Sequence, residues 1–90
     1  MKAFKWGNAK NEKLKHARGI SFEEIIQSNY LGIERHRKRK NQMIMIFEYK
    51  NYVWAVPCVI EEKRVFLKTA FPSRKYTKRY KRGGIKNEKD

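Results

Sequence analysis

Residues 43–71 read MIMIFEYKNYVWAVPCVIEEKRVFLKTAF, which is three apolar runs separated by two short polar breaks. Apolar runs of this length, bounded by turn-forming residues, are typical of buried strands. Lys50 and Asn51 form a break of two residues, the length of a tight hairpin, and asparagine accepts the positive φ that such a turn requires. We therefore predict an antiparallel meander of three strands, at 43–49, 52–60 and 65–71.

The central strand of this meander contains a proline. Pro57 lies within 52–60 and has no N–H to donate to a strand ladder, so we expect a bulge or a local break there. Pro72 then ends the third strand. Ser73 can cap a short helix in the basic stretch that follows it.

The residues before the meander predict a short edge strand and two helices. Residues 3–6 alternate apolar with polar and form the strand. Asn8 is a suitable N-cap for a first helix over 9–17, and Gly19 suits the left-handed position after it.

A capping box marks the start of the second helix. Ser21 and Glu24 can satisfy each other's backbone N–H groups, and apolar side chains recur at helical spacing as far as Tyr30. We expect Gly32 to end this helix. The dense basic run at 35–40 repels itself and forms a loop.

These elements define an α+β fold of one domain. Two N-terminal helices pack on a small antiparallel sheet, which consists of a short first strand and the meander, and a short basic segment follows. We expect residues 1–82 to form the domain and residues 83–90 to form a disordered polar tail.

Composition indicates a polyanionic partner. The 90 residues contain 23 Lys and Arg against 9 Asp and Glu, which gives a net charge of +14. Self-repulsion of this size opposes folding unless a partner relieves it, although charge also keeps a small protein in solution. No apolar run is long enough to span a membrane, and the first ten residues lack the apolar segment of a secretory signal. We therefore expect a cytoplasmic protein.

The residue types disfavour several kinds of site. Cys58 is the single cysteine and lies in an apolar run, so we expect a buried, inert thiol. His16 and His36 have no spacing that suggests a shared metal, and we expect neither a metal site nor a cofactor. Trp6 and Trp54 lie in apolar patterns that favour core positions over base stacking.

Two basic segments favour nucleic acid. They lie at 35–40 and 74–82, and tyrosines interleave with the second. Lysine and arginine neutralise phosphates, and tyrosine stacks on bases, although solvated loops are the alternative. Arginine, lysine, tyrosine, histidine and glutamate also suffice to cleave RNA without a metal, through attack of the 2′-OH on the adjacent phosphate.

The two ends of the chain resemble the BrnT family of toxins. The opening residues that carry the resemblance are Phe4-Lys5-Trp6, Lys10-Asn11, Leu14 and Arg18-Gly19-Ile20-Ser21-Phe22-Glu23-Glu24. The closing residues are Phe66-Leu67-Lys68-Thr69-Ala70-Phe71-Pro72-Ser73-Arg74-Lys75-Tyr76-Thr77-Lys78-Arg79-Tyr80. The resemblance implies a RelE-like fold and a bacterial type II toxin that cleaves RNA and blocks translation. It also implies a DNA-binding antitoxin as partner, and it leaves the ribosome as a further partner open.

The chain departs from the family pattern in two places. His16 is displaced from the position that a histidine has before the Ser-Phe start. The closing basic residues lack the glutamate that often stands among them, so its role has no matching residue here, and Tyr80 is a candidate to take its place.

Candidate site residues follow from these motifs. The resemblance implies that Arg74 clamps the phosphate, with Tyr80 as acid or stacking group, and Glu48 and His36 are candidate bases. Glu48 also fits a solvent-facing position or an ion pair with Lys68. The candidate RNA-binding residues are Arg35, Arg37, Lys38, Lys68, Lys75, Lys78 and Arg79.

Two other functions remain open from the sequence. A basic module that binds RNA or DNA without cutting it fits the missing glutamate. An interaction protein that docks an acidic partner fits the charge. We expect the antitoxin that the resemblance implies to cover the basic surface at 35–40 and 74–82.

Overall fold

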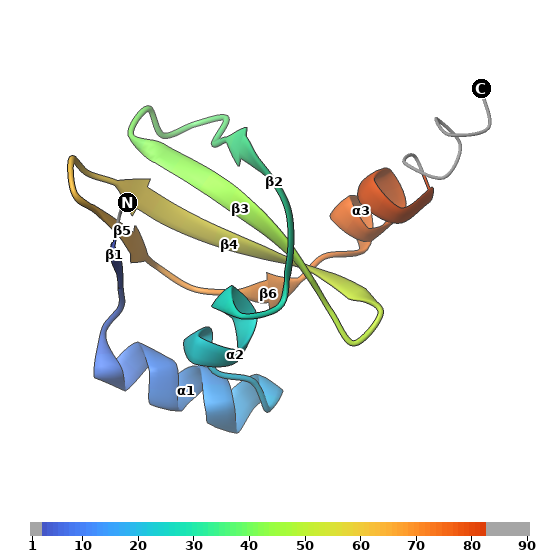
Figure 1. Cartoon of the computed structure of the whole chain (residues 1–90), viewed down its shortest axis with the longest axis horizontal. Helices are drawn as coiled ribbons and strands as arrows, with labels where there is room; N and C mark the ends of the chain where they lie inside the picture. The colour runs from blue at the N-terminus through green and yellow to red at the C-terminus, as the bar shows by residue number, and fades with distance from the viewer. Residues whose placement is uncertain (1–2, 83–90) are drawn as a thin grey trace.

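A computed structural model describes residues 3–82, and a long hairpin organises them (Figure 1). Strands β3 (Gln42–Tyr49) and β4 (Tyr52–Ile60) pair along their whole length, with Tyr49 opposite Tyr52 at the turn. Lys50 and Asn51 both have positive φ, 51° and 67°, as the two-residue hairpin predicts.

The sheet is mixed, which corrects the expectation of a purely antiparallel one. Its six strands follow the order β1-β5-β4-β3-β2, with β6 also pairing β4, so β4 is central as predicted. β1 (Ala3–Lys5) is an edge strand and runs parallel to β5 (Arg64–Leu67). The predicted third strand is interrupted, because β5 ends at Leu67 and β6 (Phe71–Pro72) resumes pairing farther along β4.

Of the bulge or local break expected at Pro57, the structure has the break and not the bulge. Pro57 pairs with Ile44 in an unshifted β3–β4 register. Its carbonyl accepts a hydrogen bond from the N–H of Lys68 at 2.9 Å, so its missing donor also faces the β5–β6 side. The ladder on that side is interrupted at Pro57, since β5 pairs from Cys58 onwards and β6 pairs with Ala55 and Trp54.

The predicted second helix is mostly wrong. Helix α2 covers only Phe22–Ile26, and Asn29–Arg35 forms a strand, β2, that pairs with β3. The Ser28 N–H and hydroxyl both donate to the carbonyl of Ile25, which closes the helix early. The outer edge of β3 would otherwise have unpaired backbone groups, and β2 satisfies them.

The cap residues explain why the other helices begin and end where they do. Helix α1 covers Asn8–Arg18 and has Gly7 at its N-cap, so the predicted Asn8 cap is wrong. Gly19 ends it at φ 69°, as expected. The capping box of Ser21 and Glu24 is present at the start of α2.

Buried residues form two cores, one on each face of the sheet, because alternate strand residues point to opposite faces. The first core lies under α1 and α2 and comprises Leu14, Ile20, Phe22, Ile25, Met45, Phe47, Trp54, Val56, Cys58, Val65, Leu67 and Ala70. Trp6 packs against it with partial exposure. The second core is smaller and comprises Ile46, Val53, Ala55 and Tyr76, with Leu31, Ile44 and Tyr80 packed against it.

The basic C-terminal segment covers the second core. Helix α3 (Arg74–Thr77) begins at Ser73, whose hydroxyl accepts the N–H of Tyr76 at 3.1 Å, as the sequence predicts. The chain continues as a π-helix, η1 (Lys78–Arg82). None of the helices within residues 3–82 is long and apolar enough to cross a membrane. The predicted tail at 83–90 lies outside the described residues.

Candidate functional site

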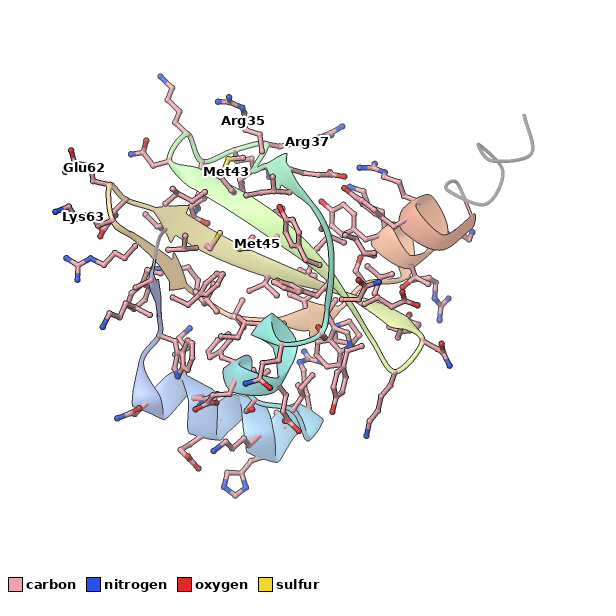
Figure 2. The ribbon with its side chains drawn as sticks, in the orientation of Figure 1. Arg35, Arg37, Met43, Met45, Glu62 and Lys63 are labelled. Atoms are coloured by element: carbon pink, nitrogen blue, oxygen red, sulfur yellow. The ribbon has the colours of Figure 1, made fainter. Side chains whose placement is uncertain are left out.

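A basic cavity of about 340 Å³ opens between β2, the loop that follows it, and the C-terminal helical segment. Its lining residues are Glu34, Arg35, His36, Arg37, Lys38, Ile44, Lys75, Tyr76 and Arg79. Arg35 and Arg37 project from the β2–β3 end of the sheet (Figure 2). Segments that are about 40 residues apart in the sequence therefore meet in one site, through the pairing of β2 with β3 and the packing of α3 on the second core.

Glu34 is the acidic residue in this lining. Arg79 Nη1 donates to both of its carboxylate oxygens, at 2.8 Å each, and the Tyr80 hydroxyl donates to Oε2 at 2.7 Å. Hydrogen bonds between ionised groups are stronger than neutral ones. This network joins the C-terminal segment to the edge strand β2.

A bulge and a glycine bring β2 and Tyr80 together. The β2–β3 register shifts between Tyr30 and Gly32, which places Gly32 opposite Ile46 and Glu34 opposite Ile44, on the face of the second core. A Cβ on Gly32 would lie 3.4 Å from the Tyr80 ring, so the glycine allows the ring to approach the strand closely. Tyr80 therefore reaches Glu34, two residues along the same face.

Side-chain hydrogen bonds fix α3 on the sheet. The Thr77 hydroxyl donates to the carbonyl of Ser73 and accepts the N–H of Val53 at 3.1 Å. Tyr76 is buried beneath the helix, and its ring lies 6.2 Å from that of Tyr80. Lys75 Nζ and the Arg79 guanidinium lie 5.3 and 5.4 Å from the Tyr76 ring centroid. These contacts hold the cations of α3 and η1 at the cavity.

The network shifts the pKa values of its members. Burial acts to raise the pKa of Glu34, but the hydrogen bonds from Arg79 and Tyr80 and the charge of Arg79 outweigh it, so that pKa is lowered. Burial, together with the hydrogen bond to Glu34, raises the pKa of Tyr80 to about 12. At neutral pH Glu34 is a carboxylate and Tyr80 a phenol that donates to it.

His36 has a defined tautomer when neutral. The backbone N–H groups of Lys38 and Arg39 donate to its Nδ1, at 3.1 and 3.2 Å. An Nδ1 that accepts hydrogen bonds has no proton, so the neutral ring has its proton on Nε2. His36 can therefore donate a hydrogen bond from Nε2 in the same cavity in which Glu34 can accept a proton.

The structure brings together only part of the set predicted from sequence. His36 lines the cavity, and Tyr80 donates a hydrogen bond to Glu34, another lining residue. Five of the predicted RNA-binding residues also line the cavity: Arg35, Arg37, Lys38, Lys75 and Arg79. Arg74 is exposed at the start of α3 and lies outside the lining, as do Glu48, Lys68 and Lys78. Glu48 accepts a hydrogen bond from Asn29 at 3.4 Å, on β2, and Lys68 Nζ lies 5.9 Å from the Phe66 ring centroid.

Sequence reasoning missed Glu34. The predicted second helix ended just before it, so no element was assigned to its position. The signal was present in the spacing of Gly32, Glu34 and His36, since alternate residues of a strand share one face.

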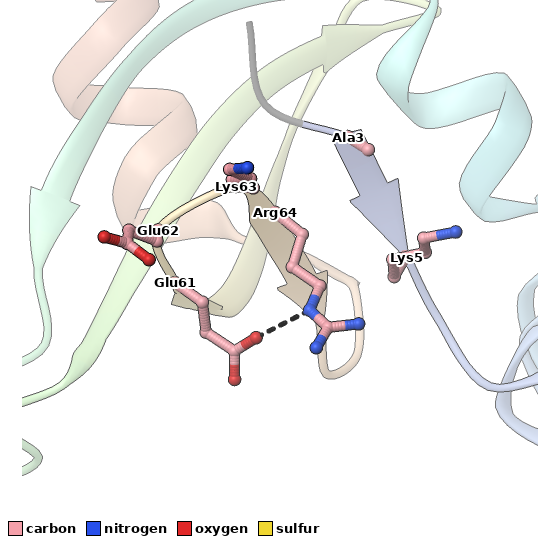
Figure 3. A pocket seen from close by; sticks show the side chains of 6 residues that line it. All are labelled: Ala3, Lys5, Glu61, Glu62, Lys63 and Arg64. Carbon is pink, nitrogen blue, oxygen red and sulfur yellow. Dashed lines mark hydrogen bonds and ion pairs between the residues drawn. The ribbon is translucent and has the colours of Figure 1, made fainter.

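A second hollow, of about 550 Å³, lies between β1 and the β4–β5 turn (Figure 3). Glu61 and Glu62 contribute to its lining beside Lys5 and Lys63. Arg64 Nε donates to Glu61 at 2.8 Å, which neutralises that cation. Mixed charge makes this hollow a poorer site for a polyanion than the cavity beside Glu34.

Within residues 3–82, the structure contains no group of three or more histidine, cysteine, aspartate or glutamate side chains placed to hold a metal ion. Cys58 is buried, and burial raises the pKa of its thiol to about 11, as an inert core cysteine requires.

Comparison with solved structures identifies a similar fold. The ribonuclease toxin BrnT of Brucella abortus superposes with a TM-score of 0.55 at 11% sequence identity, over 81% of this chain and 97% of that one. No family model matches the sequence. No curated protein matches it either. The chain therefore has the fold of the BrnT ribonuclease toxin.

Proposed function

We propose that this protein is an endoribonuclease that cleaves RNA without a metal ion, and that its active site is the cavity beside Glu34. The observation that supports this most directly is the grouping of a carboxylate, an imidazole and several cations around one cavity. Cleavage of RNA through its own 2′-OH is accelerated by a base at the 2′-OH, a hydrogen-bond donor at the leaving oxygen and positive charge at the phosphate, and these groups supply all three.

In the proposed reaction Glu34 removes the proton of the 2′-OH. The 2′ oxygen attacks the adjacent phosphorus, and the bond to the 5′ oxygen breaks. His36 donates a hydrogen bond from its Nε2–H to that leaving oxygen, which takes its proton from water, so the products are a 2′,3′-cyclic phosphate and a 5′-OH. Lys75 and Arg79 stabilise the charge on the pentacoordinate phosphorus in the transition state.

Glu34 has room to act as the base although it is already hydrogen bonded. Its Oε2 accepts from both Arg79 and Tyr80, whereas its Oε1 accepts from Arg79 alone. A carboxylate oxygen has two lone pairs, so Oε1 can still accept the 2′-OH. When an RNA phosphate binds Arg79, the contact between Arg79 and Glu34 weakens and Glu34 becomes more basic.

The biological setting that we propose is that of a type II toxin. The protein whose fold it shares is a ribonuclease toxin, and the motifs at both ends of this chain resemble the same family. In this setting a co-encoded antitoxin would bind the toxin, and RNA cleavage would inhibit translation. A net charge of +14 favours fast association with an acidic partner.

One observation favours a second candidate, a basic module that binds RNA without cutting it. Arg79 and Tyr80 already hold Glu34, and their hydrogen bonds lower its pKa, which makes it a weaker base. In this case the cavity would bind phosphates and RNA would stay intact.

Incubation of the purified protein with end-labelled RNA in EDTA tests the proposal. Two histidines allow a matched comparison, because His36 lines the cavity and His16 lies exposed on α1. We expect fragments that end in 2′,3′-cyclic phosphate, formed roughly 10²–10³-fold more slowly by His36→Ala and at the wild-type rate by His16→Ala. Equal rates for both variants would contradict the role of His36. Intact RNA that shifts on a native gel would instead support the binding module.

A further inference from the structure

A second basic cavity lies on the other face of the sheet, between the end of α1 and the β3–β4 hairpin. It has a volume of about 300 Å³, and its lining residues are Arg18, Gly19, Ile20, Tyr49, Lys50, Tyr52 and Trp54. We propose that this cavity is a second RNA-binding site, which takes a base against its tyrosines and a phosphate at Arg18 and Lys50. The identification of the ligand as RNA rests on the function proposed above. The existence of the site rests on its own lining residues.

Two turns bring the cations of this site together. Gly19, with φ 69°, ends α1 directly after Arg18. Lys50 lies in the hairpin turn with φ 51°, a conformation that a lysine adopts only where the surrounding structure imposes it. Because the turn between the paired β3 and β4 is only two residues long, the position of Lys50 is fixed by the sheet.

The charges of this site are available to a ligand. Its lining contains two cations and no carboxylate. Arg18 and Lys50 are exposed, and neither forms an ion pair with another residue of the described part of the chain. Lys50 Nζ lies 5.4 Å from the Tyr49 ring centroid, which keeps the cation beside an aromatic surface.

Aromatic rings form the remaining wall. Tyr52 is 36% exposed, whereas Trp54 is buried at 9% and forms part of the first core. Tyr49 and Tyr52 lie directly opposite each other across the hairpin, so both rings share one face. Sites for single-stranded nucleic acid combine stacking rings and cations in this way.

The cationic surface continues along α1. A neighbouring cavity of about 140 Å³ shares Arg18 with the cavity at the β3–β4 hairpin and is also lined by Lys10 and Lys13. Lys10 and Lys13 are three residues apart and share one side of α1, and Arg18 lines both cavities, so the cations continue from the helix to the hairpin. A strand of RNA several nucleotides long can follow these cations.

The two sites lie on opposite faces of the sheet and can be filled at once. Tyr49, Tyr52 and Trp54 alternate along the strands with Ile46 and Val53, which belong to the second core beneath α3. Figure 1 shows α1 and α3 on different sides of the sheet. The sheet and its two cores separate the sites, so each protein chain should bind two short oligonucleotides.

Calorimetric titration with a five-nucleotide 2′-O-methyl RNA tests this inference, since that RNA lacks the 2′-OH that cleavage needs. We expect two oligonucleotides per chain for the wild type and one for the double variant Arg18→Gln with Lys50→Asn, because asparagine keeps the positive φ of the turn. The double variant Lys5→Gln with Lys63→Gln removes equal charge from the hollow between β1 and the β4–β5 turn, and should still bind two.

A variant that keeps both Arg18 and Lys50 distinguishes binding at a defined site from non-specific attraction to positive charge. Tyr52→Leu should weaken the second site about tenfold, as expected for loss of one stacked base, with the first site unchanged. An equal number of oligonucleotides bound by the wild type and by Arg18→Gln with Lys50→Asn would overturn the inference. That result does not depend on cleavage, so failure here and failure of the proposed nuclease are distinguishable.

Discussion

The Glu34 carboxylate accepts hydrogen bonds from two side chains, Arg79 and Tyr80, so its charge contributes to the fold as well as to the cavity. Its pKa in the folded protein is lowered from the ordinary value of 4.5. A lowered pKa means that the ionised group stabilises the folded state. This stabilisation is complete above pH 4.5 and is lost as the pH falls through the folded-state value.

Glu34→Gln should remove this pH dependence. We expect the free energy of unfolding of the wild type to fall more steeply with acid below pH 4.5 than that of the variant. Urea unfolding at a series of pH values measures both curves. Other carboxylates contribute equally to both proteins, so parallel curves would show that Glu34 has no lowered pKa.

Cys58 should react only when the protein unfolds. Its side chain is fully buried in the first core, and burial raises the pKa of its thiol to about 11, so little thiolate exists near neutral pH. Labelling with a thiol-specific chromogenic reagent should be complete in denaturant and negligible in buffer. Fast labelling of the native protein would show that the cysteine is accessible.

At the scale of elements, Ser73 links the helix to the site. Its hydroxyl accepts the N–H of Tyr76 at the start of α3, and its carbonyl accepts the Thr77 hydroxyl. Ser73→Ala should reduce the free energy of unfolding by about 1 kcal/mol, the usual effect of losing an N-cap. It should also slow cleavage, because α3 carries Lys75 to the cavity.

Denaturant unfolding and the cleavage assay measure these two effects. Ser73→Asp keeps an N-cap acceptor and should retain most of the stability. An equal loss in both variants would show that the cap hydrogen bond is not the cause.

Local signals predicted those elements whose ends are set by local chemistry. The Lys50-Asn51 turn, the capping box at Ser21 and the cap at Ser73 follow from backbone and side-chain geometry over a few residues, and all three are present. Pairing across the sheet is set by distant residues instead. The parallel β1–β5 pair and the β2–β3 pair therefore could not be read from local pattern.

The error at β2 also explains what was missed in the site. A helical spacing fits the apolar residues Phe22, Ile25, Ile26 and Tyr30. In the structure, however, the second half of this segment is a strand, because it pairs with the otherwise free edge of β3. That strand carries Glu34 to Arg79 and Tyr80. Charge alone predicts that the basic residues at 35–40 and 74–82 are exposed. That residues from both segments line one cavity beside Glu34 could be known only from the fold.

At the scale of the whole molecule, cations on both faces of the sheet make RNA binding dependent on salt. Each phosphate contact releases counterions, so binding of a 2′-O-methyl RNA should weaken steeply as salt rises. Lys75→Gln removes one cation from the cavity and should lower the slope of log K against log salt by about 0.7, the value for a single-stranded ligand.

Fluorescence anisotropy at several salt concentrations gives the slopes. Lys63→Gln removes a cation from the hollow beside β1 and provides the matched control, with an unchanged slope. Equal slopes for Lys75→Gln and wild type would indicate that RNA does not contact this cavity.

The central claim is that the cavity beside Glu34 cleaves RNA, and the sharpest measurement compares two glutamates. Glu34 lies in the cavity, whereas Glu48 lies outside its lining. Both are on the same sheet face, because Glu34 pairs with Ile44, and Ile44 and Glu48 are four residues apart on β3. The single-turnover rate of RNA cleavage in EDTA should fall roughly 10²–10⁴-fold in Glu34→Gln, as for loss of a general base, and stay at the wild-type value in Glu48→Gln. Full activity in Glu34→Gln, or loss confined to Glu48→Gln, would contradict the account.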